Sequence, residues 1–370
     1  MKFSCTKSEL VQAIQTVAKA VSSKPQTPIL SGIYLKAEKG QLELQATDYD
    51  LGILCHIPAD VETEGAIVLS GRYLQDVVRR LPGDNVNVSF DKEKNIAKIN
   101  SNAANFTLLS LPANEFPKIH HLEGKIEFTI LDNVLRDLVK KTVFACSNDE
   151  ARPIFTGCLL EVNNSSVTMA ATNTHRLSVK TELLDDFNGS IKIIIPSKVL
   201  NELLRIMVSE VPSEVKVTCS YNQISFAFDN VYLTSRLIEG QFPDYRRVIP
   251  AETNTHVTLN TDDFAAAVER VSLISRAGEY NVIKLEFMGS SVRITSNNPD
   301  IGNAEERVQA EVDGPDVQIA FNANYIAEVL KNIDSKDFFF RLNQSLNPAI
   351  IREQDDDTFT YVVTPVRTSN

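Results

Sequence analysis

The stretch IYLKAEKGQLELQATD at 33–48 places apolar residues at alternate positions on both sides of a turn at Gly40. Alternation with a period of two puts one set of side chains on one face of a strand, so the stretch predicts an antiparallel hairpin. The pattern returns in CLLEVNNSSVTMAATN at 158–173 and in IKLEFMGSSVRITSN at 283–297. The residues near the ends of the second strands lie 125 and 124 positions apart: Thr47, Thr172 and Ser296. The hairpin is therefore part of a unit that occurs three times.

Other elements repeat with the same period. A short strand and a helix precede each hairpin, with strands at 2–5, 127–130 and 256–259 and helices at 8–21, 132–145 and 262–276. Short polar side chains that can cap these helices stand at their starts: Ser8, Asp132 and Asp262. A second helix is expected at 72–81, 197–208 and 323–332, where equivalent apolar residues lie 126 positions apart: Leu74, Leu200 and Ile326. Phe116-Pro117 returns as Phe242-Pro243, again after 126 positions.

A period of about 125 residues is too long for a solenoid repeat and fits a whole domain. Two helices and several antiparallel hairpins per unit predict an α+β fold, with helices covering one face of an antiparallel sheet. We therefore expect three similar domains, at 1–121, 122–250 and 251–370.

Composition excludes several classes of protein. No run of about 20 apolar residues occurs, which argues against a membrane-spanning helix and favours a cytoplasmic protein. The cysteines lack the spacing of a zinc site or a redox dithiol, so we expect them to be reduced and structural: Cys5, Cys55, Cys146, Cys158 and Cys219. We expect no bound metal and no cofactor.

The net charge of −11 argues by itself against a nucleic-acid partner, but its distribution matters more than the sum. The expected helices, taken as 7–21, 72–81, 132–145, 197–208, 262–276 and 323–332, contain thirteen Lys or Arg and nine Asp or Glu. They carry a net charge of +4, and the remainder carries −15. If equivalent helices face the same way, they form a mildly basic surface suited to phosphate contact. The alternative is that these cations simply line solvated helix faces.

Recognisable catalytic motifs are absent from the sequence. There is no Walker loop, no GxGxxG after a strand, no HExxH and no GxSxG. A hydrolase would have to use Thr172 as nucleophile and His175 as base. In an extended segment residues three apart point to opposite faces, so a structural or partner-binding role is favoured.

Four segments give the chain a specific resemblance: TPIL at 27–30, ATNTHRL at 171–177, GQFPDYRRVIP at 240–250 and YVVTPVR at 361–367. With the threefold repeat, they resemble the bacterial DNA sliding clamps, the beta subunit of DNA polymerase III, over the whole chain. The resemblance implies a ring-shaped, head-to-tail homodimer with antiparallel sheets outside and two helices per domain inside. It implies a processivity factor without catalytic residues, which a separate ATP-driven loader closes around double-stranded DNA without regard to sequence.

The resemblance also implies a groove between the second and third domains that binds short linear peptides. The expected partners are the polymerase III alpha subunit, the clamp loader, other polymerases and mismatch-repair proteins. The groove residues implied are Phe155, Thr172, Thr174, His175, Arg176, Leu177, Pro243, Arg247, Val248, Val362, Val363, Thr364, Pro365, Val366 and Arg367.

Two further sets of residues follow from the resemblance. The cations implied to face DNA are Lys24, Arg72, Arg79, Arg136, Lys140, Lys198 and Arg205. At the dimer seam, Phe106 and Leu108 of one chain are expected to meet Leu273 and Ile274 of the other; an ordinary core position is the alternative for each.

The chain departs from the family in the groove and at its end. Phe155 and Thr364 stand where members often carry leucine and methionine, which changes the expected shape of the groove. A short polar tail follows at 368–370. The alternative to a clamp is a three-domain interaction scaffold that never encircles DNA.

Overall fold

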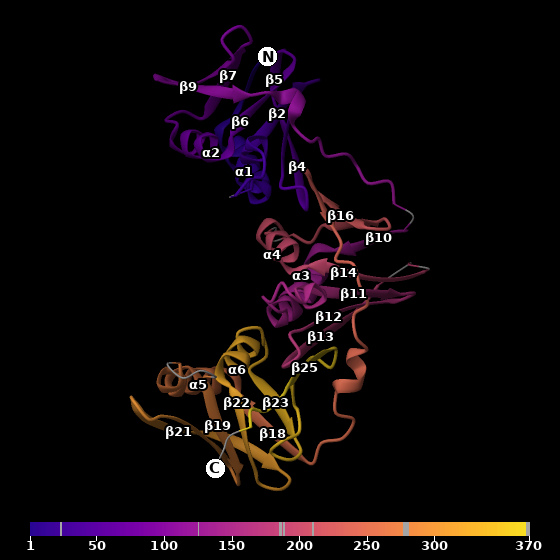
Figure 1. Cartoon of the computed structure of the whole chain (residues 1–370), viewed down its shortest axis with the longest axis vertical. Helices are drawn as coiled ribbons and strands as arrows, with labels where there is room; N and C mark the ends of the chain where they lie inside the picture. The colour runs from indigo at the N-terminus through magenta and orange to yellow at the C-terminus, as the bar shows by residue number, and fades with distance from the viewer. Residues whose placement is uncertain are drawn as a thin grey trace. The chain divides into compact units, whose positions relative to one another are not determined.

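A computed structural model of the chain describes residues 1–22, 24–124, 126–184, 187, 189–208, 211–276 and 281–367. The polar tail at 368–370 lies outside these residues. By internal contacts the chain divides into two compact units (Figure 1). Unit 1 comprises Met1–Asn133 and Glu202–Leu237, and unit 2 comprises Val134–Asn201 and Ile238–Asn370. The middle repeat therefore contributes strands to both units.

Unit 1 is built on one antiparallel sheet, which has 13 strands in the described part of the chain. From edge to edge they are β10 (Ile126–Leu131), β15 (Glu214–Cys219), β16 (Gln223–Phe228), β17 (Val231–Arg236), β4 (Leu51–Pro58), β3 (Gln41–Thr47), β2 (Gly32–Glu38), β6 (Gly65–Ser70), β9 (Ala104–Leu111), β8 (Ile96–Ser101), β7 (Asn85–Asp91), β1 (Lys2–Thr6) and β5 (Asp60–Thr63). Pairing of β17 with β4, with Leu233 opposite Ile53, joins the second repeat to the first.

Unit 2 is built in the same way, with a sheet of 12 strands among its described residues. In order they are β14 (Ser190–Pro196), β11 (Gly157–Asn163), β12 (Ser166–Thr172), β13 (Arg176–Leu183), β25 (Phe359–Val363), β24 (Ala349–Glu353), β23 (Asp337–Leu342), β18 (Thr255–Asn260), β21 (Gly302–Asp313), β20 (Ser291–Asn298), β19 (Val282–Met288) and β22 (Val317–Asn322). Here β13 pairs with β25, with Leu177 opposite Val362, and joins the second repeat to the third.

The described residues form six α-helices, two for each sequence repeat, as predicted. They are α1 (Lys7–Val17), α2 (Gly71–Arg80), α3 (Asp132–Thr142), α4 (Ser197–Ile206), α5 (Thr261–Ser275) and α6 (Ala323–Leu330). Short 3₁₀ turns lie at η1 (Ala18–Ala20), η2 (Pro28–Ser31), η3 (Ala113–Glu115), η4 (Val143–Ala145), η5 (Pro153–Phe155) and η6 (Tyr245–Val248). In unit 1, α1 packs on α2 and on β3 and β4, and in unit 2 α5 packs on α6 and on β19–β21. The expected arrangement of helices on an antiparallel sheet is confirmed.

Two of the predicted helix caps were wrong by two residues. Thr6 caps α1, because its Oγ1 accepts a hydrogen bond from the Glu9 N–H at 3.4 Å. Asn260 caps α5 by accepting from the Asp263 N–H at 3.1 Å. Ser8 and Asp262 lie inside the first turns, where an acid at 262 still complements the helix dipole.

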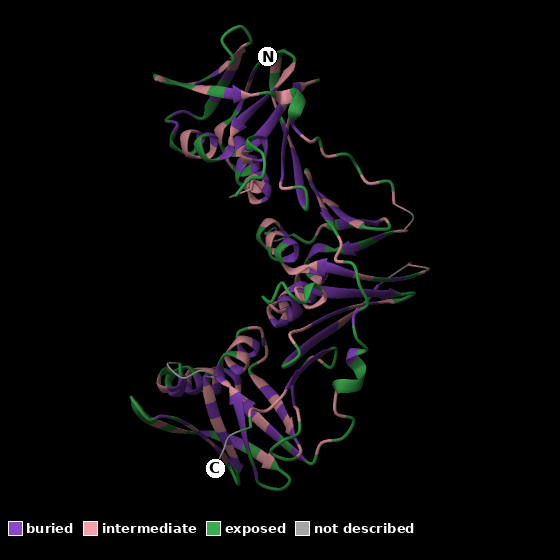
Figure 2. Ribbon diagram, in the orientation of Figure 1, coloured by how far each residue is buried: buried purple, intermediate pink, exposed green. Residues whose placement is uncertain are grey.

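The equivalent helix positions of the three repeats are core positions. Leu74, Leu200 and Ile326 are each at most 2% exposed. Figure 2 shows the central strands of each unit buried along most of their length. Burial raises the pKa of the Cys55 thiol to about 11, so this cysteine stays protonated at neutral pH and packs as a small apolar residue. Among the described residues, no helix is long and apolar enough to cross a membrane.

Not every helix cation reaches the surface. Lys141 of α3 is 2% exposed, and its Nζ donates to the Asn332 carbonyl at 2.6 Å and to the Glu353 carboxylate. The Asp334 carboxylate lies 3.0 Å from the same nitrogen. Lys141 is one of the thirteen cations of the expected helices, but its charge is neutralised inside unit 2. The prediction that it contributes to a basic helix surface was therefore wrong.

We predict that Lys141→Ala lowers the free energy of unfolding by ~3–5 kcal/mol, because it leaves the Glu353 carboxylate buried without its partner. Urea unfolding of the full chain, followed by circular dichroism, measures the change. The matched control is Lys140→Ala, whose ion pair with Asp334 at 2.7 Å is solvent-exposed and should contribute at most ~1 kcal/mol. Equal effects of the two substitutions would contradict the prediction.

Candidate peptide-binding groove

Unit 2 contains a cavity of about 330 Å³ where its two repeats meet. Its walls come from the loop between β12 and β13, from η5 and η6, and from the end of β25. The lining residues are Phe155, Thr172, Thr174, His175, Arg176, Leu177, Pro243, Asp244, Tyr245, Val248, Pro348, Val362 and Thr364. Most of the surface that they present is apolar, which suits a hydrophobic side chain of a ligand.

Internal hydrogen bonds hold the 173–175 loop in shape. The Thr172 hydroxyl donates to the Arg176 carbonyl at 2.6 Å and accepts from the Thr174 N–H at 3.1 Å. The Asn173 carboxamide oxygen accepts from the N–H groups of His175 and Arg176. These bonds keep Thr174 at φ 77°, a left-handed conformation that is uncommon for a threonine. Because the Thr172 hydroxyl donates to a carbonyl in this turn, the arrangement does not support a nucleophile activated by His175.

Arg176 belongs to the framework of the groove. Its guanidinium lies 4.6 Å from the centre of the Tyr325 ring and donates to the Phe144 carbonyl at 2.5 Å and to the Glu328 carboxylate. Burial lowers the pKa of Arg176, but Tyr361 and Glu328 outweigh it, so the pKa is raised above its ordinary value. The charge of this arginine is therefore compensated within unit 2.

A buried carboxylate holds η6 in place. Glu161 accepts hydrogen bonds from the Tyr245 hydroxyl at 3.0 Å and from Arg246 at 2.6 Å, and Lys192 lies 3.1 Å away. Burial alone would raise the pKa of Glu161, but the hydrogen bonds from Arg246, Lys192 and Tyr245 bring it below its ordinary value. With η6 fixed, Val248 stays on the cavity wall while 54% of it remains exposed.

Ten of the fifteen predicted groove residues line this cavity. The other five lie outside the lining: Arg247, Val363, Pro365, Val366 and Arg367. Arg247 points to solvent and pairs with Asp244 at 2.9 Å, whereas Val363 is fully buried in the core of unit 2. The N–H of Val366 donates to the Ala320 carbonyl at 2.8 Å, which directs the chain away from β25.

Three lining residues were missed: Asp244, Tyr245 and Pro348. The first two belong to the 240–250 segment that carries the resemblance, so that segment could have indicated them. Pro348 lies just before β24 and had no such signal. Pairing of β24 with β25 brings it to the groove.

The cations predicted to face DNA differ in their surroundings. Lys24, Arg72 and Lys198 are exposed, and Arg136 is partly buried. Three others have an acidic neighbour: Arg79 lies 3.5 Å from Asp76, Lys140 2.7 Å from Asp334, and Arg205 2.7 Å from Glu202. These neighbours reduce the positive charge that the helices present.

The predicted seam residues are all at least partly exposed, with Leu273 at 59% and Phe106 at 38%. Phe106 and Leu108 lie on β9, and Leu273 and Ile274 on α5. Residues 104–109 of β9 pair with β8 alone among the described strands, and residues 302–309 of β21 pair with β20 alone. Each unit therefore has a strand segment with an open edge, which can pair with another chain.

Comparisons with known proteins identify the family. Models of the N-terminal, central and C-terminal domains of the DNA polymerase III beta subunit match residues 1–120, 129–244 and 246–367. The chain is 33% identical to the beta sliding clamp of Bacillus subtilis, with both chains fully covered, and 31% identical to that of Staphylococcus aureus. The crystal structure of the Bacillus subtilis clamp matches with a TM-score of 0.95. A Pseudomonas aeruginosa sliding clamp bound to griselimycin, 31% identical and fully covered, matches with a TM-score of 0.94.

The chain belongs to the DNA polymerase III beta subunit family. It is a DNA sliding clamp, a non-catalytic processivity factor of DNA replication, as the sequence predicted.

We predict that Glu161→Gln lowers the free energy of unfolding at pH 7 by ~1–3 kcal/mol, the range for hydrogen bonds to a charged group. Because the folded-state pKa of Glu161 is depressed, its contribution is present above the ordinary glutamate pKa and is lost as the pH falls through the folded pKa. The difference between the two proteins should therefore shrink below about pH 4.

Urea unfolding at pH 7 and at lower pH measures this difference. Asp244→Asn is the control, because its pair with Arg247 on the same 3₁₀ turn is exposed and should contribute less than ~1 kcal/mol. A loss of stability in Glu161→Gln that stays constant with pH would show that the charge of Glu161 is not its cause.

Proposed function

We propose that two copies of the chain close head to tail into a ring around double-stranded DNA, and that the groove binds short peptide segments of proteins acting on that DNA. The ring consists of six domains, three from each chain at 1–121, 122–250 and 251–370, with the helices toward the DNA. The partners are the polymerase III alpha subunit, the clamp loader, other polymerases and mismatch-repair proteins. Such a protein works where the bacterial chromosome lies, in the cytoplasm.

The observation that carries the peptide-binding role is the convergence of ten predicted residues on one largely apolar cavity. Thr174, in the loop between β12 and β13, and Val248, at the end of η6, are exposed at its rim and leave it open to solvent. A hydrophobic anchor of a peptide can enter beside Leu177 and Val362, and the polar rim can bind its backbone.

The open strand edges support the closed dimer. If 104–109 of β9 in one chain pairs with 302–309 of β21 in the other, both edges gain backbone hydrogen bonds. Phe106 and Leu108 would then pack against Leu273 and Ile274 and leave solvent together. Because the two edges differ, the contact is heterologous, and two such contacts close a ring of two chains.

The cations suit sliding better than tight binding. Arg79, Lys140 and Arg205 have acidic neighbours, so their attraction to phosphates is weak. A ring with weakly basic helices toward its hole is retained by topology and can still move along the duplex.

We predict that the protein, loaded on a nicked circular plasmid by its cognate loader and ATP, stays bound during gel filtration and is released when the plasmid is cut once. A closed ring can leave DNA only over a free end. The control is an equal incubation without the restriction enzyme. Retention on the linear plasmid would show that direct affinity holds the protein, as expected for a DNA-binding scaffold that does not encircle the duplex.

We predict that Val248→Asp weakens binding of the polymerase III alpha subunit by at least about tenfold, because it places a charge where an apolar anchor must be desolvated. Surface plasmon resonance with the immobilised alpha subunit measures the affinity. Leu183→Asp is the matched control, since Leu183 is 82% exposed at the end of β13 and outside the cavity. Unchanged affinity in Val248→Asp would rule out this groove as the binding site.

A further inference from the structure

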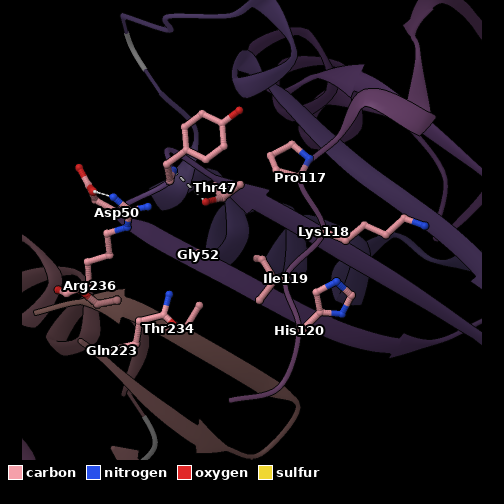
Figure 3. A pocket seen from close by; sticks show the side chains of 12 residues that line it. Thr47, Asp50, Gly52, Pro117, Lys118, Ile119, His120, Gln223, Thr234 and Arg236 are labelled. Atoms are coloured by element: carbon pink, nitrogen blue, oxygen red, sulfur yellow. Dashed lines mark hydrogen bonds and ion pairs between the residues drawn. The ribbon is translucent and has the colours of Figure 1, made fainter. Parts of the chain in front are cut away.

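Unit 1 contains a second cavity, of about 260 Å³, where the first repeat meets the second (Figure 3). Its lining residues are Thr47, Tyr49, Asp50, Gly52, Pro117, Lys118, Ile119, His120, Gln223, Thr234, Ser235 and Arg236. They come from the loop between β3 and β4, from the segment that follows η3, and from β16 and β17. The groove of unit 2 is built from the equivalent parts of the next repeats.

The loops that border the two cavities have the same hydrogen bonds. The Thr47 hydroxyl accepts from the Tyr49 N–H at 3.0 Å, as Thr172 accepts from Thr174 at 3.1 Å. The Asp48 carboxylate accepts from the N–H groups of Asp50 and Leu51, at 3.1 and 2.8 Å. The Asn173 side chain accepts from His175 and Arg176 in the same way. The φ angle is 78° at Tyr49 and 77° at Thr174.

The strands across the two junctions also meet in the same register. The Arg236 N–H donates to the Asp50 carbonyl at 2.9 Å, and the Thr364 N–H donates to the His175 carbonyl at the same distance. Pro117 and Pro243 line the respective cavities from equivalent positions. The cavity in unit 1 is therefore the counterpart of the groove in backbone as well as in sequence.

The apolar part of the second cavity is smaller. Gly52 pairs with Thr234 where Leu177 pairs with Val362 in the groove. A Cβ at Gly52 would lie 3.0 Å from the Ile119 Cδ1, so the glycine makes room for Ile119 to pack onto the strand. The Ile119 N–H donates to the buried Gln45 carboxamide at 2.8 Å, which fixes this segment. Figure 3 shows Ile119 directed toward the strand that carries Gly52.

The charge of the second cavity also differs. Its lining carries two cations, Lys118 and Arg236, and one acid, Asp50, in a chain whose net charge is −11. Asp50 lies 3.9 Å from Arg236, and both side chains are exposed, so their attraction is weak. The arginine can therefore exchange this contact for a carboxylate of a ligand. At the position of Lys118 the groove has Asp244 instead.

We propose that the cavity of unit 1 is a second peptide-binding site, which takes a short acidic segment of a partner protein. An apolar side chain of the segment packs against Pro117 and Ile119, and a neighbouring carboxylate pairs with Arg236. That the ligand is a peptide rests on the proposed function of the groove in unit 2. That the peptide is acidic rests on the lining of the cavity in unit 1. A partner with one segment for each site would gain affinity by binding to both.

The test is a titration of the full-length protein, labelled with ¹³C in its isoleucine and valine methyl groups, followed by NMR. The probe is an amidated tetrapeptide in which two aspartates flank two leucines, and its control carries asparagines in place of the aspartates. We expect the aspartate peptide to shift the Ile119 methyl signal saturably and the asparagine peptide to bind more weakly. Arg236→Gln should weaken the aspartate peptide about fivefold, the upper end for an exposed ion pair.

Arg80→Gln is the matched control for charge, because Arg80 is similarly exposed in unit 1 and lies outside the cavity. An Ile119 signal that does not move, or an affinity that Arg236→Gln leaves unchanged, would overturn the proposal. Signals of Val248 report on the groove in the same titration, and the alpha-subunit experiment with Val248→Asp tests the groove separately. Failure at one site is thus distinguishable from failure at the other.

Discussion

Antiparallel pairing between strands of successive repeats is the constraint on which both cavities depend. In unit 2, β13 pairs with β25 from Arg176 opposite Val363 to Lys180 opposite Phe359. In unit 1, β4 and β17 make the equivalent connection. The backbone hydrogen bonds of a sheet fix the register. Each pairing therefore places the last strand of one repeat beside a loop of the previous repeat, the loop between β3 and β4 in unit 1 and the loop between β12 and β13 in unit 2. A cavity forms at each of these junctions.

Buried charges reinforce the junction in unit 2. The Lys180 ammonium on β13 lies 2.7 Å from both Asp356 and Glu182 and donates to the Thr358 hydroxyl at 2.8 Å. Lys141 and Arg176 are likewise buried beside carboxylates of the third repeat, Glu353 and Glu328. A buried charge is tolerated only with its partner in place, so these pairs favour one arrangement of the two repeats. The positive charges of the sequence therefore have two roles, and only some of them are available to a ligand.

The two junctions share a backbone but differ in chemistry. Tyr49 and Thr174 have nearly the same backbone conformation, yet their loops border cavities with different linings. In the groove, Leu177, Val362 and Val248 provide an apolar surface. In the cavity of unit 1, Gly52, Arg236 and Lys118 provide a smaller apolar area and a cationic rim. Repetition of a domain thus preserves the backbone geometry around the cavity while the side chains at each copy diverge.

The sequence by itself determined the repeated unit, because hydrophobic periodicity and spacing are local properties that recur at 33–48, 158–173 and 283–297. It also indicated the family and, through the resemblance, ten residues that line the groove, nine of which lie in the 171–177, 240–250 and 361–367 segments. Only the tertiary structure decided that Lys141 is buried, that Val363 belongs to the core, and that Pro348 reaches the groove. These outcomes depend on pairing between strands far apart in the chain, such as β24 with β25 and β13 with β25, which no local pattern specifies.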